Sequence, residues 1–243
     1  AAYNSLAYRL GLNTATVARF PPDQSDISLI LRSFTMYDER HSKIEETKTA
    51  LQEMLESTPD DHEILAELAR LDKDNGLDTL PYEAVLLPVG GEQAISIANL
   101  LSYHDLHAEN VKRLGTGLWD DPGLASEEAL EGSWFSAPPP NLRSTFVKRY
   151  QEFHGTRPPR IATLAYDATA LASILSAQGM KSTGKPAFTH RDITNPNGFA
   201  GLDGIFRFRT DGLIERGLAV LEFKNKKIVV VDPAPTSFQA KNN

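Results

Sequence analysis

The 243-residue sequence contains no cysteine, so disulfide bonds, thiolate metal sites and cysteine nucleophiles are excluded. It has no apolar run approaching the roughly 20 residues that a membrane-spanning helix needs. Common catalytic motifs are missing too, including a G-x-S-x-G elbow, an H-E-x-x-H helix and a G-x-G-x-x-G turn after a strand. With no nucleophile, base or metal set to name, we expect a protein that binds rather than catalyses.

The residues that are present have the balance of an ordinary globular protein, with 41% hydrophobic and 23% charged side chains. The length suffices for one large domain or two small ones. The net charge of −7 is uneven, because residues 23–79 carry −9 and residues 180–243 carry +4. The acidic part has a helical pattern, which is typical of a solvated helix face. An acidic balance without a basic-aromatic stripe argues against nucleic acid as a partner.

Hydrophobic spacing predicts an α/β protein with strand–helix units in its first half. Residues 14–20 are β-prone and end at a proline pair. Residues 83–87 are typical of a strand buried on both faces, and the pair Gly90-Gly91 turns it into a helix. Residues 111–114 predict the next strand, which ends at the run 115–117.

Two polar helices are predicted to form a hairpin that is inserted at about residues 38–78. The second half changes character, with one helix capped by Asn141 and another over residues 160–177. Three β-rich pieces then follow, of which the last two predict an antiparallel hairpin. These pieces are residues 205–209, 218–223 and 228–231.

The turns after the two predicted parallel strands are the candidate ligand-binding site. Open α/β sheets bind ligands at the carboxyl ends of their strands, and glycines let the backbone approach a ligand closely. Trp119 has two open interpretations: an exposed apolar platform for the ligand, or a side chain that packs against the sheet edge. The predicted ligand-binding residues are Gly90, Gly91, Glu92, Thr116, Gly117, Trp119 and Asp120.

Two further motifs predict neither a cofactor nor a metal site. Residues 179–185 have the beginning of a phosphate-binding P-loop, but Pro186 stands where a Ser or Thr must hold magnesium. His104 and His107 lie three residues apart in an expected exposed turn, and no further ligands with suitable spacing are nearby. We therefore expect a surface loop at the first place and a polar helix-to-strand loop at the second.

The order of several short segments resembles the Leu/Ile/Val-binding type of periplasmic solute-binding protein, the two-lobed type I class. No single motif carries the resemblance, and the helical insertion lies outside it. Residues 115–122, 166–168 and 231–238 are more narrowly similar to the branch of penicillin-binding protein activators. The segments that resemble the wider class are residues 20–26, 87–91, 114–117, 131–135, 160–168 and 201–206.

The resemblance implies two lobes joined by crossing strands, with a ligand cleft between them. Residues 1–136 and 210–243 would form a second-lobe α/β domain with a parallel sheet, flanking helices and a C-terminal antiparallel hairpin. Residues 137–209 would be helices and crossing segments of a first lobe that is otherwise largely missing. Residues 132–136 and 209–213 would then be hinge candidates.

The resemblance also implies a non-enzymatic protein of the bacterial periplasm, with an N-terminal signal for secretion or lipid anchoring expected upstream. One function is an activator that contacts an envelope protein such as a peptidoglycan synthase. The alternative is the substrate-binding protein of an ABC transporter for branched-chain or related amino acids. Amino-acid-binding members have an acidic residue in the loop that matches residues 115–118, where this chain has none. Asp120 or Glu92 would have to offset the ligand's ammonium instead.

Overall fold

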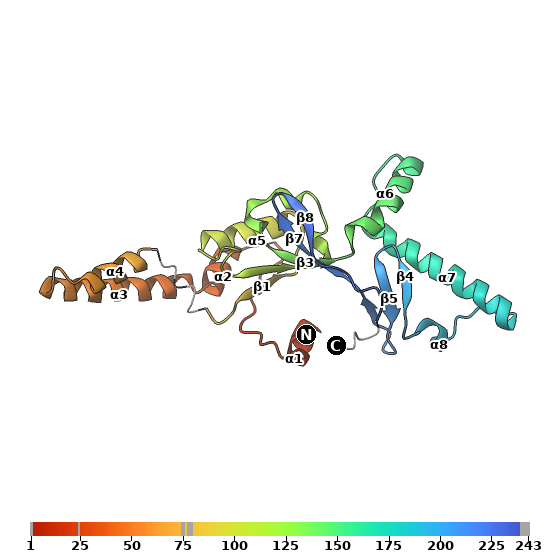
Figure 1. Cartoon of the computed structure of the whole chain (residues 1–243), viewed down its shortest axis with the longest axis horizontal. Helices are drawn as coiled ribbons and strands as arrows, with labels where there is room; N and C mark the ends of the chain where they lie inside the picture. Colours follow the sequence, from red (N-terminus) through yellow and green to blue (C-terminus); the bar gives the residue numbers. More distant parts are fainter. Residues whose placement is uncertain (1, 24, 74–75, 77–79, 239–243) are drawn as a thin grey trace. The chain divides into compact units, whose positions relative to one another are not determined.

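The protein was studied as a computed structural model, which describes residues 2–23, 25–73, 76 and 80–238 (Figure 1). The chain divides into two compact units. Residues 1–133 with 223–227 form unit 1, and residues 134–222 with 228–243 form unit 2. No helix in the described ranges is long and apolar enough to cross a membrane.

Helices and short strands together make a mixed α/β protein. The first half contains α1 (Ala2–Arg9), α2 (Ile27–Phe34), α3 (Tyr37–Ser57), α4 (His62–Leu71), β1 (Ala84–Leu87), α5 (Gly91–Tyr103) and β2 (Lys112–Gly115). The second half contains β3 (Trp134–Ala137), α6 (Pro140–His154), α7 (Ala162–Thr183), α8 (His190–Ile193), β4 (Phe199–Gly201), β5 (Gly204–Phe208), β6 (Ile214–Arg216), β7 (Ala219–Lys224) and β8 (Lys227–Asp232). The strands are ordered β1-β2-β3-β7-β8 in one sheet and β4-β5-β6 in the other.

The core of unit 1 lies around β1, β2 and α5. β1 and β2 run parallel, as the sequence predicts, with Leu87 opposite Gly115 in the last pair of the register. α5 buries residues at the i, i+3, i+4 and i+7 spacing of a single helix face. These residues are Ala94, Ile97, Ala98 and Leu101, and the strand side chains Val85 and Leu87 are buried as well.

The predicted helical hairpin is present as α3 and α4, which lie side by side (Figure 1). Asp61 caps α4, because its carboxylate accepts hydrogen bonds from the backbone N–H groups of Glu63 and Ile64 at 2.9 and 3.2 Å. Ile44 and Leu71 are buried in the hairpin, whereas most of its acidic side chains are exposed. The acidic stretch of the sequence is therefore a solvated helix pair.

Unit 2 contains a buried polar cluster at the start of α7. Asp203 is only 1% exposed, and its carboxylate accepts hydrogen bonds from Arg160 Nη1 and Thr163 Oγ1, both at 2.9 Å. One turn further along α7, Asp167 accepts a hydrogen bond from the backbone N–H of Leu202 at 2.7 Å. A buried carboxylate is costly unless it is paired and hydrogen-bonded, so this cluster fixes α7 to the turn between β4 and β5.

Several local expectations differ from the structure. Residues 179–183, expected in a surface loop, form the last turn of α7, and Gly179 is buried there. Residues 14–20 form no strand, because β-propensity reflects packing on a sheet and not an intrinsic backbone preference. α6 begins at Pro140, one residue before the expected cap Asn141, since the fixed φ of proline suits the first helical position. The three-residue strands β4 and β6 are absent from the sequence prediction, and strands this short carry little periodic signal.

Candidate functional site

The carboxyl ends of β1 and β2 bring the two predicted turns to one edge of the sheet. The turn after β1 runs through Gly90, which caps α5, and the turn after β2 begins with Thr116. The indole Nε1 of Trp119 donates a hydrogen bond to the carbonyl of Val89 at 2.7 Å, which joins the two turns directly. We call residues 88–92 and 116–120 together the turn pair.

Trp119 holds the turn pair together from within and is not a ligand platform. Its side chain is 0% exposed, and its ring stacks on Phe223 with 5.9 Å between ring centroids. A Cβ added at Gly115 would lie 2.1 Å from the indole, so the indole fits only because residue 115 has no side chain. The interpretation of an exposed platform is therefore wrong, and the packing interpretation is confirmed.

Leu118 supplies the exposed apolar surface that the sequence had suggested for Trp119. Its side chain is 61% exposed, and its Cβ would lie 2.9 Å from a Cβ added at Gly90. Leu118 is not among the predicted site residues, because a leucine next to a tryptophan in a turn gives no sign of which side chain turns inward. In the structure both residues lie in the short 3₁₀ turn Gly117–Trp119, with Trp119 buried and Leu118 exposed.

The other predicted site residues lie around this contact. Gly91 and Glu92 are exposed at the start of α5, and Gly91 has a φ of 56° that favours glycine. The Thr116 hydroxyl accepts a hydrogen bond from the backbone N–H of Leu118 at 3.3 Å. Asp120 is half-buried, which leaves Glu92 as the more open carboxylate of the turn pair.

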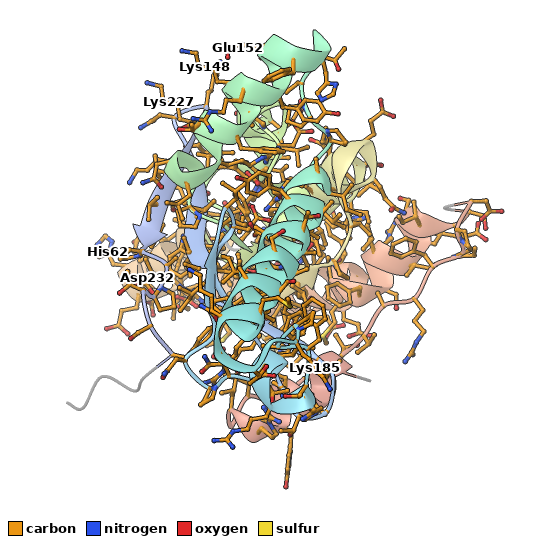
Figure 2. All side chains as sticks on the ribbon, turned by 90° about the vertical axis from the view of Figure 1, so that its right-hand side faces the viewer. His62, Lys148, Glu152, Lys185, Lys227 and Asp232 are labelled. Carbon is orange, nitrogen blue, oxygen red and sulfur yellow. The ribbon has the colours of Figure 1, made fainter. Side chains whose placement is uncertain are left out.

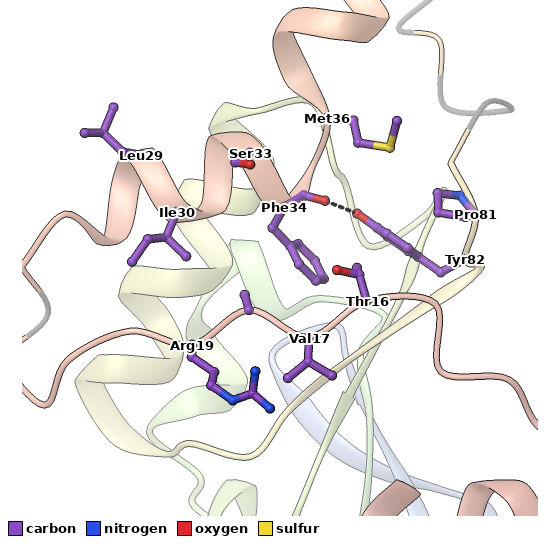
Figure 3. Close-up of a pocket in the computed structure, with 11 residues that line it drawn as sticks. Thr16, Val17, Arg19, Leu29, Ile30, Ser33, Phe34, Met36, Pro81 and Tyr82 are labelled. Atoms are coloured by element: carbon purple, nitrogen blue, oxygen red, sulfur yellow. Dashed lines mark hydrogen bonds between the residues drawn. The ribbon is translucent and has the colours of Figure 1, made fainter.

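Two cavities also lie in unit 1, and neither is lined by a predicted site residue. One has a volume of about 420 Å³ and lies between residues 13–20 and β1, with walls that include Leu31 and Ile97. The other has a volume of about 510 Å³ and is lined by α2 residues together with Pro81 and Tyr82 (Figure 3). Their volumes are in the range of small-molecule pockets, but their walls carry few polar groups.

Phe34 and Tyr82 form one wall of the larger cavity (Figure 3). Their rings stack with 5.2 Å between centroids, and the Tyr82 hydroxyl donates a hydrogen bond to the Phe34 carbonyl at 2.8 Å. Burial raises the pKa of the Tyr82 phenol to about 12. This phenol is therefore a structural donor at neutral pH and not an acid.

The sequence expected His104 in an exposed turn, and the structure places it in the core. His104 caps the C-terminus of α5 and is 2% exposed, and the rings of Tyr37 at the start of α3 and Tyr103 of α5 pack against it. Within the described ranges, no group of three or more His, Asp or Glu side chains is placed to hold a metal ion.

The parallel pair, its glycine turns and the flanking helices define the class of this fold. It is the fold of type I periplasmic-binding-protein-like proteins. No protein-family model matches the sequence. No curated protein matches it either.

Solved structures with this fold include transport proteins from several bacteria. A protein assigned as a branched-chain amino acid ABC transporter from Rhodospirillum rubrum is 18% identical with a TM-score of 0.52, over 61% of this chain and 44% of that one. A branched-chain amino acid ABC transporter periplasmic ligand-binding protein from Burkholderia xenovorans is 16% identical with a TM-score of 0.46, over 63% and 44% of the two chains. This chain thus spans less than half the length of these proteins. Such identities establish the fold alone, and they do not show the narrower similarity to penicillin-binding protein activators.

Proposed function

We propose that this chain is the ligand-binding part of a periplasmic, non-enzymatic solute-binding protein of an ABC transporter. Its ligand would be a branched-chain or related amino acid, bound at the turn pair. The observation that carries this proposal is the hydrogen bond between Trp119 Nε1 and the Val89 carbonyl, which makes one preorganised wall of two separate turns. Residues 1–136 and 210–243 would then belong to the second lobe, and residues 137–209 to the first.

The surface of the turn pair has the groups that such a ligand requires. Leu118 offers an exposed apolar contact for a branched side chain. Glu92 is exposed in the first turn of α5 and would offset the ammonium of the ligand. The glycines at 91 and 117 are exposed, so the ligand can approach their backbone closely.

Isothermal titration of the chain with leucine, isoleucine, valine and 4-methylpentanoate tests this proposal. We expect Leu118→Ala to weaken amino-acid binding about tenfold, since a buried apolar contact is worth roughly 1–3 kcal/mol. Glu92→Gln should weaken the binding of leucine but not the binding of 4-methylpentanoate, which is leucine without its ammonium group.

Matched control variants lie on α6. Leu142 is exposed there, and Glu152 projects from the same helix (Figure 2). Leu142→Ala and Glu152→Gln should leave all affinities unchanged. The proposal fails if no amino acid binds, or if Leu118→Ala and Glu92→Gln behave like these controls.

A second candidate function is an activator that contacts an envelope protein such as a peptidoglycan synthase. The observation that favours it is the solvated α3–α4 hairpin, whose exposed acidic side chains suit a basic partner surface. Purified peptidoglycan synthases should then retain the chain in a pull-down, and Glu53→Lys with Glu56→Lys should abolish the retention. Tight leucine binding without retention would exclude this function.

A further inference from the structure

The helical hairpin is joined to the end of α5 by a compact group of polar and aromatic side chains, which the turn pair does not use. We call this group the insertion junction; it consists of Tyr37, Arg40, His41, His104 and Asp105. Arg40 is 2% exposed, and it donates hydrogen bonds to the carbonyls of Thr35 at 2.9 Å and His104 at 2.8 Å. Arg40 thus connects the beginning of α3 to the C-cap residue of α5.

The imidazole of His104 is enclosed without a hydrogen-bond partner. Among the described groups, neither ring nitrogen has a donor or acceptor in hydrogen-bond geometry. The rings of Tyr37 and Tyr103 meet it edge-on, with centroids 5.3 and 5.2 Å away. A charged ring would lose most of its hydration in this enclosure, so burial favours the neutral form.

Charges from every neighbouring element face this ring. Burial is the main effect and lowers the pKa of His104, and the nearby Arg32 guanidinium acts in the same direction. The Ser28 carbonyl and two carboxylates partly oppose it. The titratable and charged groups around the ring are Arg32 of α2, Tyr37, Asp38, Arg40 and His41 of α3, Tyr103 of α5, and Asp105 of the following turn.

A second histidine and two strained turns complete the junction. His41 Nε2 lies 2.8 Å from an Asp105 carboxylate oxygen, which joins α3 to the turn after α5. Asp105 has a φ of 62° and Met36, just before α3, has a φ of 51°. Non-glycine residues hold this left-handed conformation only while the surrounding packing imposes it.

We propose that the insertion junction is an acid-sensitive latch, in which a proton on His104 releases the beginning of α3 from the end of α5. The imidazolium would be buried with the Arg32 guanidinium nearby and with no partner of its ring nitrogens in hydrogen-bond geometry among the described groups, so the ring has to leave its enclosure to be fully solvated. The strained turns then relax, and the hairpin moves independently of α5. Because burial lowers the folded-state pKa, the unfolded chain takes up this proton first. The stability of the latch is therefore complete above the ordinary histidine pKa of about 6.5 and is lost as the pH falls below it.

Spin labels on the hairpin and on α5 report the latch directly. The chain has no native cysteine, so Gln52→Cys on α3 and Ser96→Cys on α5, both exposed, can be labelled specifically. We expect the distance between the two labels to have one narrow distribution at neutral pH and a broad distribution near pH 5. His104→Phe keeps the ring contacts but cannot titrate, so its distribution should stay narrow. His154→Gln, an exposed histidine on α6, should respond as the unsubstituted labelled chain does.

An NMR titration of the histidine ring protons provides a second measurement that does not depend on the His104→Phe protein folding. His104 should titrate below the ordinary histidine pKa of about 6.5, and line broadening in residues 36–41 should follow the His104 titration. The proposal is overturned if the distance distribution does not change with pH, if His104→Phe broadens like the unsubstituted labelled chain, or if His104 titrates at or above the ordinary histidine pKa of about 6.5. No ligand is present in either experiment, so failure of the latch says nothing against the proposed transport function.

Discussion

Gly115 at the end of β2 is the position where one added methyl group should disturb the turn pair most. A Cβ at residue 115 would lie 2.1, 2.3 and 2.6 Å from three ring carbons of Trp119, whereas carbon atoms in contact are about 3.5–4.0 Å apart. Gly115 does not have a positive φ, so alanine is compatible with the backbone and the effect is purely steric. The indole has to move by more than an ångström, which breaks its hydrogen bond to Val89 and its stacking on Phe223.

The expected cost of Gly115→Ala follows from these contacts. Overpacking a core costs about 1–3 kcal/mol, and the lost hydrogen bond adds about 1 kcal/mol. We therefore expect unit 1 to lose about 2–4 kcal/mol of unfolding free energy, a large fraction of the total for a small domain. Urea unfolding followed by tryptophan fluorescence measures this loss. The chain has two tryptophans, so a Trp134→Phe background leaves Trp119 as the only emitter.

Two comparisons separate this steric effect from a general intolerance of alanine. Gly123 has a φ of −61°, and an added Cβ there would meet only Asp121 Oδ1, at 3.3 Å. Gly123→Ala should therefore cost less than about 1 kcal/mol. In a Trp119→Ala background, followed by circular dichroism, Gly115→Ala should cost almost nothing, because its steric partner has gone. The reasoning is refuted if Gly115→Ala leaves the urea midpoint unchanged, or if its cost is the same in both backgrounds.

Three further predictions concern buried polar groups. Asp203→Asn should lower the unfolding free energy of unit 2 by about 2–4 kcal/mol, since the Arg160 guanidinium loses its buried counter-charge. The melting temperature should fall accordingly, and an unchanged melting temperature would contradict this. Burial raises the pKa of Tyr82 from 10.0 to about 12, so the folded chain holds this proton more tightly than the unfolded chain does. The unfolding free energy that this gives below pH 10 should be lost as the pH rises towards 12. Tyr82→Phe should remove this loss in alkaline unfolding curves. Arg113→Lys should cost about 2–4 kcal/mol in urea unfolding, because Nη2 of Arg113 bonds the Ser102 hydroxyl and the Leu106 carbonyl while Nη1 bonds the Ala129 carbonyl, and one ammonium cannot reach both sides; a cost below about 1 kcal/mol would refute this.

Local patterns in the sequence were sufficient to predict the main elements of unit 1. The strand at residues 84–87, the helix that follows Gly90 and the strand at residues 112–115 were each visible as an apolar run or a periodic face bounded by glycine. The α3–α4 hairpin was visible for the same reason. Such features depend on neighbours within about seven residues along the chain, which the sequence displays directly.

The sequence also located the candidate site but not the roles of its side chains. The two strands were predicted to be parallel neighbours, and the carboxyl ends of parallel neighbours share an edge. Which of two adjacent side chains turns inward depends on the space left by Gly115 and on Phe223, more than one hundred residues away. For that reason Trp119 was open to two interpretations and Leu118 was overlooked.

Tertiary contacts alone decided the properties of the histidines and of residues 14–20. An exposed turn was the natural expectation for His104, and the packing of Tyr37, at the start of α3, against the end of α5 helps to enclose its ring. Residues 14–20 have the composition of a strand, but a strand requires a neighbouring edge that completes its hydrogen bonds. Burial and pairing are properties of segments distant in the chain, so the sequence determined the elements, and their packing determined which side chains are available for function.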